Sequence, residues 1–222
     1  MNARNPDIQA PAAIPRPAQD TRLTRTYQEP AYLPALTGEG GNEDTVRAET
    51  RAWLAANFET EPEIWLELPN KASGKPKLVY NDAVEEALCF GWIDSIIKKL
   101  DEDTAAQRYT PRNPRSGYSQ LNVERLRWLA ERDLIHSSVR NEIKPVIEQE
   151  FVFPEDILAE IKAIPKAWEH FQQFSPSYQR IRVAYIDGAR SRKEEFDKRL
   201  NYFLKQTEQN KQIGYGGTEK YF

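Results

Sequence analysis

The sequence predicts an α+β protein, with a small antiparallel sheet and packed helices followed by a helical C-terminal region. Between residues 43 and 150, segments with apolar residues at helical spacing alternate with short runs of β-prone residues. From residue 151 onward only helical patterns follow, each near a proline or serine. Five tryptophans, ten tyrosines and nine phenylalanines supply enough apolar surface for a core.

Composition divides the chain into four parts. Residues 1–42 begin with four prolines and almost no large apolar side chain, which predicts a disordered or loosely docked N-terminal extension. We expect an α+β core over residues 43–150 and a helical region over 151–208 that packs on the core. Residues 209–222 are glycine-rich, which predicts a flexible tail unless its aromatic residues dock.

The first elements of the core are a helix and a strand. A helix begins at Asp44 or Thr45 and ends near Asn57. The run EIWLEL over residues 63–68 alternates, which predicts a half-exposed strand with Trp65 on its exposed face. The following KPKLVY is at best an edge strand or an extended entry to the next element, since proline cannot donate to a ladder.

The sequence pattern in the middle of the core predicts a helix, a hairpin and a second helix. The first helix covers residues 81–90 and ends at Gly91, in the position where a left-handed residue is common. Two strands, over 92–100 and 107–110, surround the acidic turn Asp101-Glu102-Asp103. Ser119 is a good N-cap for a helix that continues to Glu131.

The rest of the chain predicts five helices. A proline at position 145 should kink or shorten the first of them. They are expected over residues 137–149, 154–163, 165–174, 175–189 and 191–206.

Charge and composition exclude several classes of partner. The net charge is −3 with both signs interspersed, so nucleic acid and anionic membrane surfaces are not expected partners. No run of about 18 apolar residues is present, so no membrane insertion is expected. One cysteine suits a reducing, cytoplasmic location. One cysteine and two histidines cannot build an ordinary zinc site, so we expect no metal and no cofactor.

The segment from Ala87 to Asn122 contains a candidate anion site. Arg112 and Arg115 can each present a planar donor fork, and Ser116 and Ser119 add hydroxyl groups. The helix that starts near Ser119 adds backbone N–H groups and a favourable dipole. Together these groups could bind a carboxylate or a phosphate. Trp92 and Asn122 complete the set of candidate ligand-binding residues.

Two carboxylates are candidates for acid and base chemistry. Glu86 lies one turn before Gly91 and Asp94 just after it, so both could face one cavity beside Trp92, where apolar contact favours a protonated carboxyl group. The alternative is a structural network in which the two loop arginines neutralise both acids. No nucleophile or metal shell accompanies these carboxylates, so the sequence does not decide whether the protein is an enzyme.

The remaining reactive side chains predict structural roles. Cys89 is flanked by Leu88 and Phe90 at the end of an apolar helix, where cysteine packs as a small hydrophobic residue. His136 and His170 carry no companion motif and are expected at the surface.

Two strings, EEALCFGWIDSIIKKLD and QRYTPRNPRSGYSQLN, resemble the YdeI/OmpD-associated family, also described as bacteriocin-protection proteins. The later PEDILAEIKAIPKAWEHFQQFSPSYQRIRVAYIDGA looks like that family's C-terminal helical region, so the resemblance covers about residues 45–205. The chain departs from the family pattern at Gly117-Tyr118 and around Glu194-Glu195. The pattern maps onto Glu86, Cys89, Gly91, Trp92, Asp94, Thr110, Pro111, Arg112, Arg115, Ser116, Ser119 and Asn122.

The resemblance implies a small α+β protein associated with protection against bacteriocins or antimicrobial peptides in envelope stress. The leading hypothesis is a cytoplasmic protein that binds an anionic small ligand or a protein partner at the central loop. One rival is an enzyme that uses Glu86 or Asp94 on an anionic substrate. Another is a purely structural or interaction protein, which an exposed apolar patch would indicate. The sequence leaves the oligomeric state and the identity of the ligand open.

Overall fold

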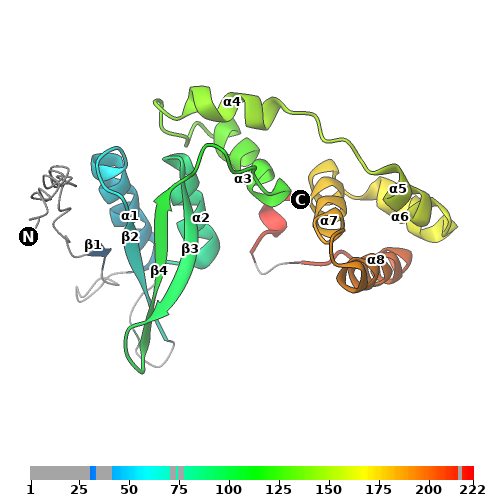
Figure 1. Cartoon of the computed structure of the whole chain (residues 1–222), viewed down its shortest axis with the longest axis horizontal. Coiled ribbons are helices and arrows are strands. Elements are labelled where there is room, and N and C mark those ends of the chain that lie inside the picture. The colour runs from blue at the N-terminus through cyan, green and yellow to red at the C-terminus, as the bar shows by residue number, and fades with distance from the viewer. Residues whose placement is uncertain (1–30, 34–41, 71–73, 75–77, 215–216) are drawn as a thin grey trace, which may run out of the picture.

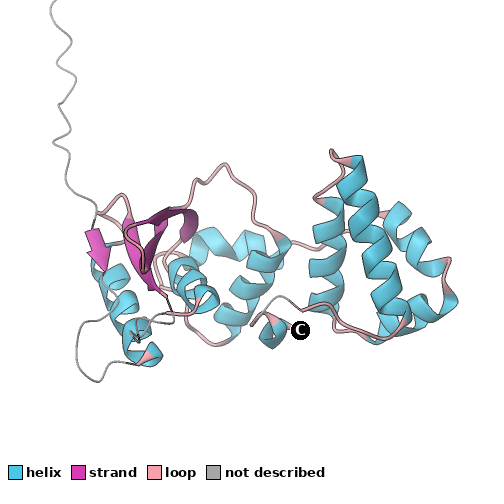
Figure 2. Cartoon of the chain, turned by 90° about the horizontal axis from the view of Figure 1, so that it is seen from below, coloured by secondary structure: helices cyan, strands magenta, loops and turns pink. Residues whose placement is uncertain are grey.

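A computed structural model describes residues 31–33, 42–70, 74, 78–214 and 217–222, and it confirms the α+β class (Figure 1). The predicted N-terminal extension lies outside the described residues, except for 31–33 and 42. In Figure 2 the strands lie toward one end of the molecule, and the last four α-helices lie toward the other.

A small sheet forms the first layer of the core. Its strand order is β1-β2-β4-β3, in which β2, β4 and β3 are antiparallel and the short β1 runs parallel to β2. The bounds are β1 Ala31–Leu33, β2 Ile64–Pro69, β3 Trp92–Lys99 and β4 Thr104–Pro111.

The prediction that Trp65 lies on an exposed strand face is wrong. Strand β2 is central, between β1 and β4, and both of its faces are covered near its start. Trp65 is buried beside Ile64 and Leu66, and its indole N–H donates to Glu63 at 3.0 Å. A central strand therefore buries residues that a simple alternation assigns to solvent.

The β3–β4 hairpin is present and longer than predicted, because β4 begins at Thr104. The carboxylate of Asp101 accepts from the backbone N–H groups of Asp103 and Thr104 at 2.8 and 2.7 Å and closes the acidic turn. The described part of KPKLVY is not an edge strand; it agrees with the alternative, an extended entry, since Val79 has an extended backbone just before α2. Leu78 and Val79 are irregular and the next residue begins a helix, while residues 75–77 lie outside the described range.

Four helices pack with the sheet around the first of two hydrophobic cores. Asn42, rather than Asp44 or Thr45, caps the first helix by accepting from the Thr45 N–H at 3.0 Å. Gly91 has a φ of 73°, as predicted for a helix end, and Ser119 caps α3. The helices are α1 Glu43–Asn57, α2 Tyr80–Cys89, α3 Gln120–Glu131 and α4 Arg140–Glu148.

The second core consists of helices alone, and its four α-helices begin close to the predicted positions. Ile157, Phe171, Tyr178 and Phe203 are among its buried residues. A short 3-10 helix, η2, follows at Glu219–Tyr221. The bounds are α5 Glu155–Lys162, α6 Pro165–Gln173, α7 Pro176–Asp187 and α8 Lys193–Glu208.

Helices α3 and α7 bring the two cores together through a buried ion cluster. Glu124 on α3 is 4% exposed, and its two carboxylate oxygens accept from Arg180 on α7 at 2.7 and 2.8 Å. Arg127 and Gln120 donate to the same carboxylate at 2.8 and 2.7 Å. Burial and four hydrogen bonds make this carboxylate the strongest polar link between the cores.

We therefore expect Glu124→Ala to destabilise the protein, because it leaves two partly buried arginines without their acid. A loss of about 3 kcal/mol is the usual scale for breaking one side of such a pair. Urea unfolding measures the effect. Glu131→Ala removes an exposed carboxylate from the same helix as a control and should change the free energy of unfolding by less than about 0.5 kcal/mol. Equal effects of the two variants would contradict the interpretation.

Candidate functional site

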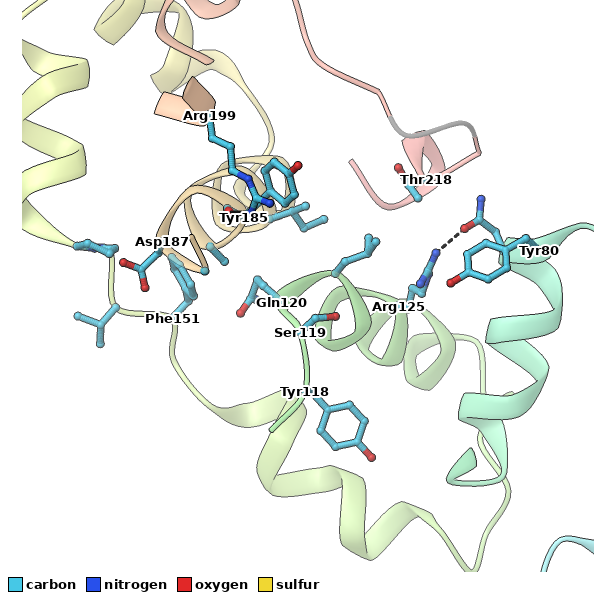
Figure 3. Close-up of a pocket in the computed structure, with 17 residues that line it drawn as sticks. Tyr80, Tyr118, Ser119, Gln120, Arg125, Phe151, Tyr185, Asp187, Arg199 and Thr218 are labelled. Carbon is cyan, nitrogen blue, oxygen red and sulfur yellow. Dashed lines mark hydrogen bonds between the residues drawn. The ribbon is translucent and has the colours of Figure 1, made fainter. Parts of the chain in front are cut away.

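A cavity of about 770 Å³ lies where the two cores meet (Figure 3). Its walls come from the start of α2, from α3, from α7 and α8, and from the link at Phe151–Pro154. Most of the lining is aromatic or aliphatic, including Tyr80, Leu121, Phe151 and Ile181. This volume is within the range of about 300–1,000 Å³ that small-molecule sites usually have.

Arg125 is the notable polar group of the cavity wall. It is 4% exposed on α3, and its Nη1 donates to Asn122 Oδ1 at 2.8 Å while Nη2 donates to Asn81 Oδ1. Figure 3 shows the guanidinium of Arg125 extending toward α2 on the side where Tyr80 lies. Among the described residues no carboxylate forms an ion pair with Arg125, and its Nε–H has no acceptor.

The C-terminal residues supply another part of the wall. Thr218 lines the cavity at 2% exposure, and its hydroxyl has no partner within the described ranges. The ring of Tyr221 is 5.7 Å from the Arg125 guanidinium and packs against Trp128. Tyr221 thus docks, which is the case the sequence left open, while Tyr215 lies outside the described residues.

Gly217 lets the tail approach α2 closely. Its φ is +91°, and a Cβ placed on it would lie 2.9 Å from the Asn81 amide nitrogen. Asn81 is 7% exposed and its oxygen is held by Arg125, so this side chain has little freedom to move aside. Glycine is therefore required at this position by both backbone conformation and space.

The other charged residues of the wall are paired. Arg199 donates to Glu195 and to the Tyr185 carbonyl, both at 2.7 Å, and lies over the Tyr185 ring. Asp187 accepts from Arg190. Of the two arginines that line this cavity, Arg125 is the one without a carboxylate partner among the residues that the structure describes.

Two of the predicted ligand-binding residues belong to this site. Ser119 lines the cavity and caps α3 by accepting from the Asn122 N–H at 3.3 Å. Asn122 takes part indirectly, because its side chain holds Arg125. Trp92 lies elsewhere: it is 1% exposed, and its indole N–H donates to the Phe58 carbonyl at 3.1 Å.

The predicted arginine pair does not converge. Arg112 donates to the carbonyl oxygens of Ser116, at 2.7 Å, and Gly117, and lies over the Tyr118 ring, so it stabilises its own loop. Arg115 and Ser116 are exposed and line a second cavity of about 530 Å³, which adjoins the first and shares Tyr118, Gln120, Phe151 and Val152 with it. Thus no two-arginine clamp forms.

The two candidate catalytic carboxylates have different surroundings. Glu86 is 3% exposed and receives hydrogen bonds from Arg47 at 2.7 Å and from Arg51 at 2.8 Å. It lines neither cavity described here. Asp94 accepts from the Tyr80 hydroxyl at 2.8 Å. The arginines that neutralise Glu86 therefore come from α1 and not from the loop at 112–115.

The remaining reactive residues are structural. Cys89 is fully buried in the first core, as the sequence predicts. Both histidines are half-buried at the surface: His136 packs against Phe58 and Phe90, and His170 contacts the Thr207 carbonyl at 2.9 Å. Within the described residues no group of three or more His, Cys, Asp or Glu side chains could hold a metal ion.

Comparison with known families divides the chain at the junction of the two cores. Residues 44–142 match the family described as Domain of unknown function (DUF8412). Residues 150–210 match the family described as Bacteriocin-protection, YdeI or OmpD-Associated. No curated protein and no solved structure matches the chain.

The residues that line the cavity come from both matched segments. Tyr80 and Arg125 come from the DUF8412 segment, Phe151 and Tyr185 come from the YdeI/OmpD-associated segment, and Thr218 lies beyond both. The motifs ALCFGWID and TPRNPRS lie in the DUF8412 segment, so the family match covers the C-terminal part of the resemblance. None of the helices in the described part of the chain has the length and apolar character needed to cross a membrane.

Sequence reasoning missed Arg125 and Thr218. One signal for Arg125 was present, since it stands four residues after Leu121 and four before Leu129, on the apolar side of α3. A charged residue at such a position either has a buried partner or faces a cavity. Nothing in the sequence near Thr218 indicates that the tail returns to α2.

Cys89 should react very slowly with a thiol reagent in the native state. Burial, followed by the nearby Glu86 charge, raises the pKa of this thiol to about 12 from its ordinary value near 9. This higher pKa reduces the thiolate population roughly a thousandfold at pH 8. Dithionitrobenzoate reaction rates, with and without guanidinium chloride, measure the effect on the single thiol. Equal rates in both conditions would show that Cys89 is accessible.

Tyr80 should ionise well above its ordinary range. Partial loss of solvent around this half-exposed ring, followed by the hydrogen bond to Asp94, raises its pKa to about 12. The stabilisation from the neutral phenol is therefore complete below about pH 10 and is lost as the pH rises toward 12. Asp94→Asn should lower this pKa toward 10 without reaching it, because burial remains. Titration by ¹³C-tyrosine NMR, with Tyr80→Phe to assign the resonance, tests this. An unchanged pKa in Asp94→Asn would contradict the role of Asp94.

Proposed function

We propose that the protein is a binding protein of the YdeI/OmpD-associated type that takes up a small ligand in the cavity between α3 and α7. The observation that carries this proposal is a largely apolar cavity of about 770 Å³ whose wall contains a buried guanidinium, that of Arg125, with no carboxylate partner in the described part of the chain. Apolar walls with a few convergent polar groups are typical of ligand sites.

The location of the cavity supports a binding role for the two segments together. Residues of the DUF8412 segment and of the bacteriocin-protection segment face the same space, and the Glu124–Arg180 pair fixes α3 against α7. Neither segment alone contains the complete wall. The proposal therefore explains why both segments occur in one chain.

Binding is favoured over catalysis because of what lines the cavity. Glu86 and Asp94, the two carboxylates considered for acid and base chemistry, are not in its wall. Ser119 uses its hydroxyl as a helix cap. In this proposal the protein takes up its ligand in the cytoplasm, a compartment whose reducing conditions suit the buried thiol of Cys89.

The family suggests the physiological setting. A protein with a bacteriocin-protection segment would contribute to survival of envelope stress from bacteriocins or antimicrobial peptides. In this proposal the occupied cavity, rather than a catalytic step, provides the protective function, either directly or through a protein partner that recognises the occupied form.

Filling the cavity should abolish the function while leaving the fold intact. Ala184 lines the cavity from α7, so Ala184→Trp places a large ring in the space. In a strain that lacks the gene, wild-type protein should restore survival on polymyxin B, and Ala184→Trp should not. Circular dichroism melting of the purified variant checks that it is folded.

Ala159→Trp is the matched control, since Ala159 is exposed on α5 and does not line the cavity. It should restore survival as well as the wild-type protein does. If folded Ala184→Trp also restores survival fully, the cavity is not the functional site. If wild-type protein has no effect on survival, the protective role is wrong.

A further inference from the structure

We infer that the ligand of this cavity is a small organic monocarboxylate with an apolar body, bound through Arg125 of α3 and Thr218 of the C-terminal segment. The inference rests on the proposed function, because it names the ligand class of the same cavity. It depends on separate observations, which concern charge, unused donors and the position of the tail.

The charges around Arg125 leave it uncompensated. The three acids of the neighbouring helix α2 are paired with other cations: Arg47 contacts all three, Arg51 contacts Glu86, and Lys220 contacts the other two, Asp82 and Glu85. Asp94 bonds the Tyr80 hydroxyl and forms no ion pair with Arg125 in the described structure. A buried cation without an anion is costly, so an anionic ligand would be stabilised here.

Two donors in the wall are unused. The Nε–H of Arg125 and the hydroxyl of Thr218 are both buried, both belong to residues that line the cavity, and neither has an acceptor in the described part of the molecule. Buried polar groups nearly always have partners in native proteins, so each orphan needs an explanation. A carboxylate has two oxygens and can accept from both donors.

The tail places Thr218 close to the guanidinium. Gly217, the residue before it, lies against Asn81, and Tyr221, three residues later, lies over Arg125. Asn81 accepts a hydrogen bond from Arg125 itself. Thr218 therefore lies between two residues that contact this cluster, which places it at the Arg125 end of the cavity.

The single positive charge of Arg125 favours a carboxylate over a phosphate. One guanidinium carries one positive charge, and a phosphate dianion would keep a second negative charge in an apolar space. Water could accept from the Nε–H, but it carries no charge and leaves Arg125 uncompensated. Away from Arg125 the wall contains Phe151, Ile181 and Tyr185, which suit an aromatic or aliphatic body.

Titration calorimetry with benzoate, benzamide and phenyl phosphate tests the inference on the full chain. Benzoate and benzamide have nearly the same shape, so their difference isolates the charge. We expect benzoate to bind at least tenfold more tightly than benzamide and more tightly than phenyl phosphate. Thr218→Val should weaken benzoate binding about tenfold and leave benzamide binding unchanged, because it removes only one donor to the carboxylate.

The matched control is Thr207→Val. Thr207 is also buried with an unpartnered hydroxyl within the described ranges, and it does not line the cavity. Both valine variants should keep the wild-type melting temperature or raise it, since each removes an unsatisfied hydroxyl. Arg125→Met should remove the preference for benzoate over benzamide, and melting curves show whether that variant is folded.

The outcomes separate this inference from the proposed function. Equal binding of benzoate and benzamide, or tighter binding of phenyl phosphate, would overturn the carboxylate assignment while the cavity remains a binding site. An unchanged benzoate affinity in Thr218→Val would also overturn it. Survival that no longer depends on an open cavity, measured with Ala184→Trp, would instead overturn the proposed function. Loss of benzoate binding in Thr207→Val equal to that in Thr218→Val would show a general effect of packing and would contradict the assignment.

Discussion

The contact on which the site depends is the buried ion cluster at Glu124. The buried residues of each hydrophobic core come from one segment of the chain, whereas the cavity exists only while α3 and α7 lie side by side (Figure 1). Glu124 receives two hydrogen bonds from Arg180 across this junction and two more from its own helix. Because an ion pair is directional, it fixes the relative position of the helices in a way that apolar packing alone does not.

The same junction explains how an apolar cavity can contain a cation. Arg125 follows Glu124 directly on α3 but contacts different groups: the amide oxygens of Asn122 and Asn81 and the ring of Tyr221. These groups orient the guanidinium but do not neutralise it, and the cost of burying such a charge is of the order of several kcal/mol. A protein that retains this arrangement gives up stability at a position where a ligand could restore it.

Local chemistry made much of the fold predictable. Gly91 ends its helix in the left-handed region, Ser119 caps α3, and Cys89 is a buried hydrophobic residue, all as the sequence indicates. Each of these depends on residues a few positions away. Trp65 was assigned to the wrong face because its burial depends on the position of β2 within the sheet, which no local pattern reveals.

The site was less predictable for the same reason. The partners of Glu86 are 35 and 39 residues away on α1, and the loop arginines that are nearer in sequence do not reach it. Arg112 instead found acceptors four and five residues along its own loop. Sequence proximity suggested a clamp, whereas the structure assembles its binding candidates from α3 and from a segment 93 positions after Arg125.

The close contact at Gly217 restricts which residues can occur together at positions 217, 81 and 125. Its missing side chain is the space into which the Asn81 amide fits, and that amide in turn orients Arg125. A relative with a larger residue at position 217 would need a smaller one at position 81, and would then lose one support of the guanidinium. Substitutions at these two positions and at Arg125 should therefore be correlated across relatives, even though the three residues are far apart along the chain.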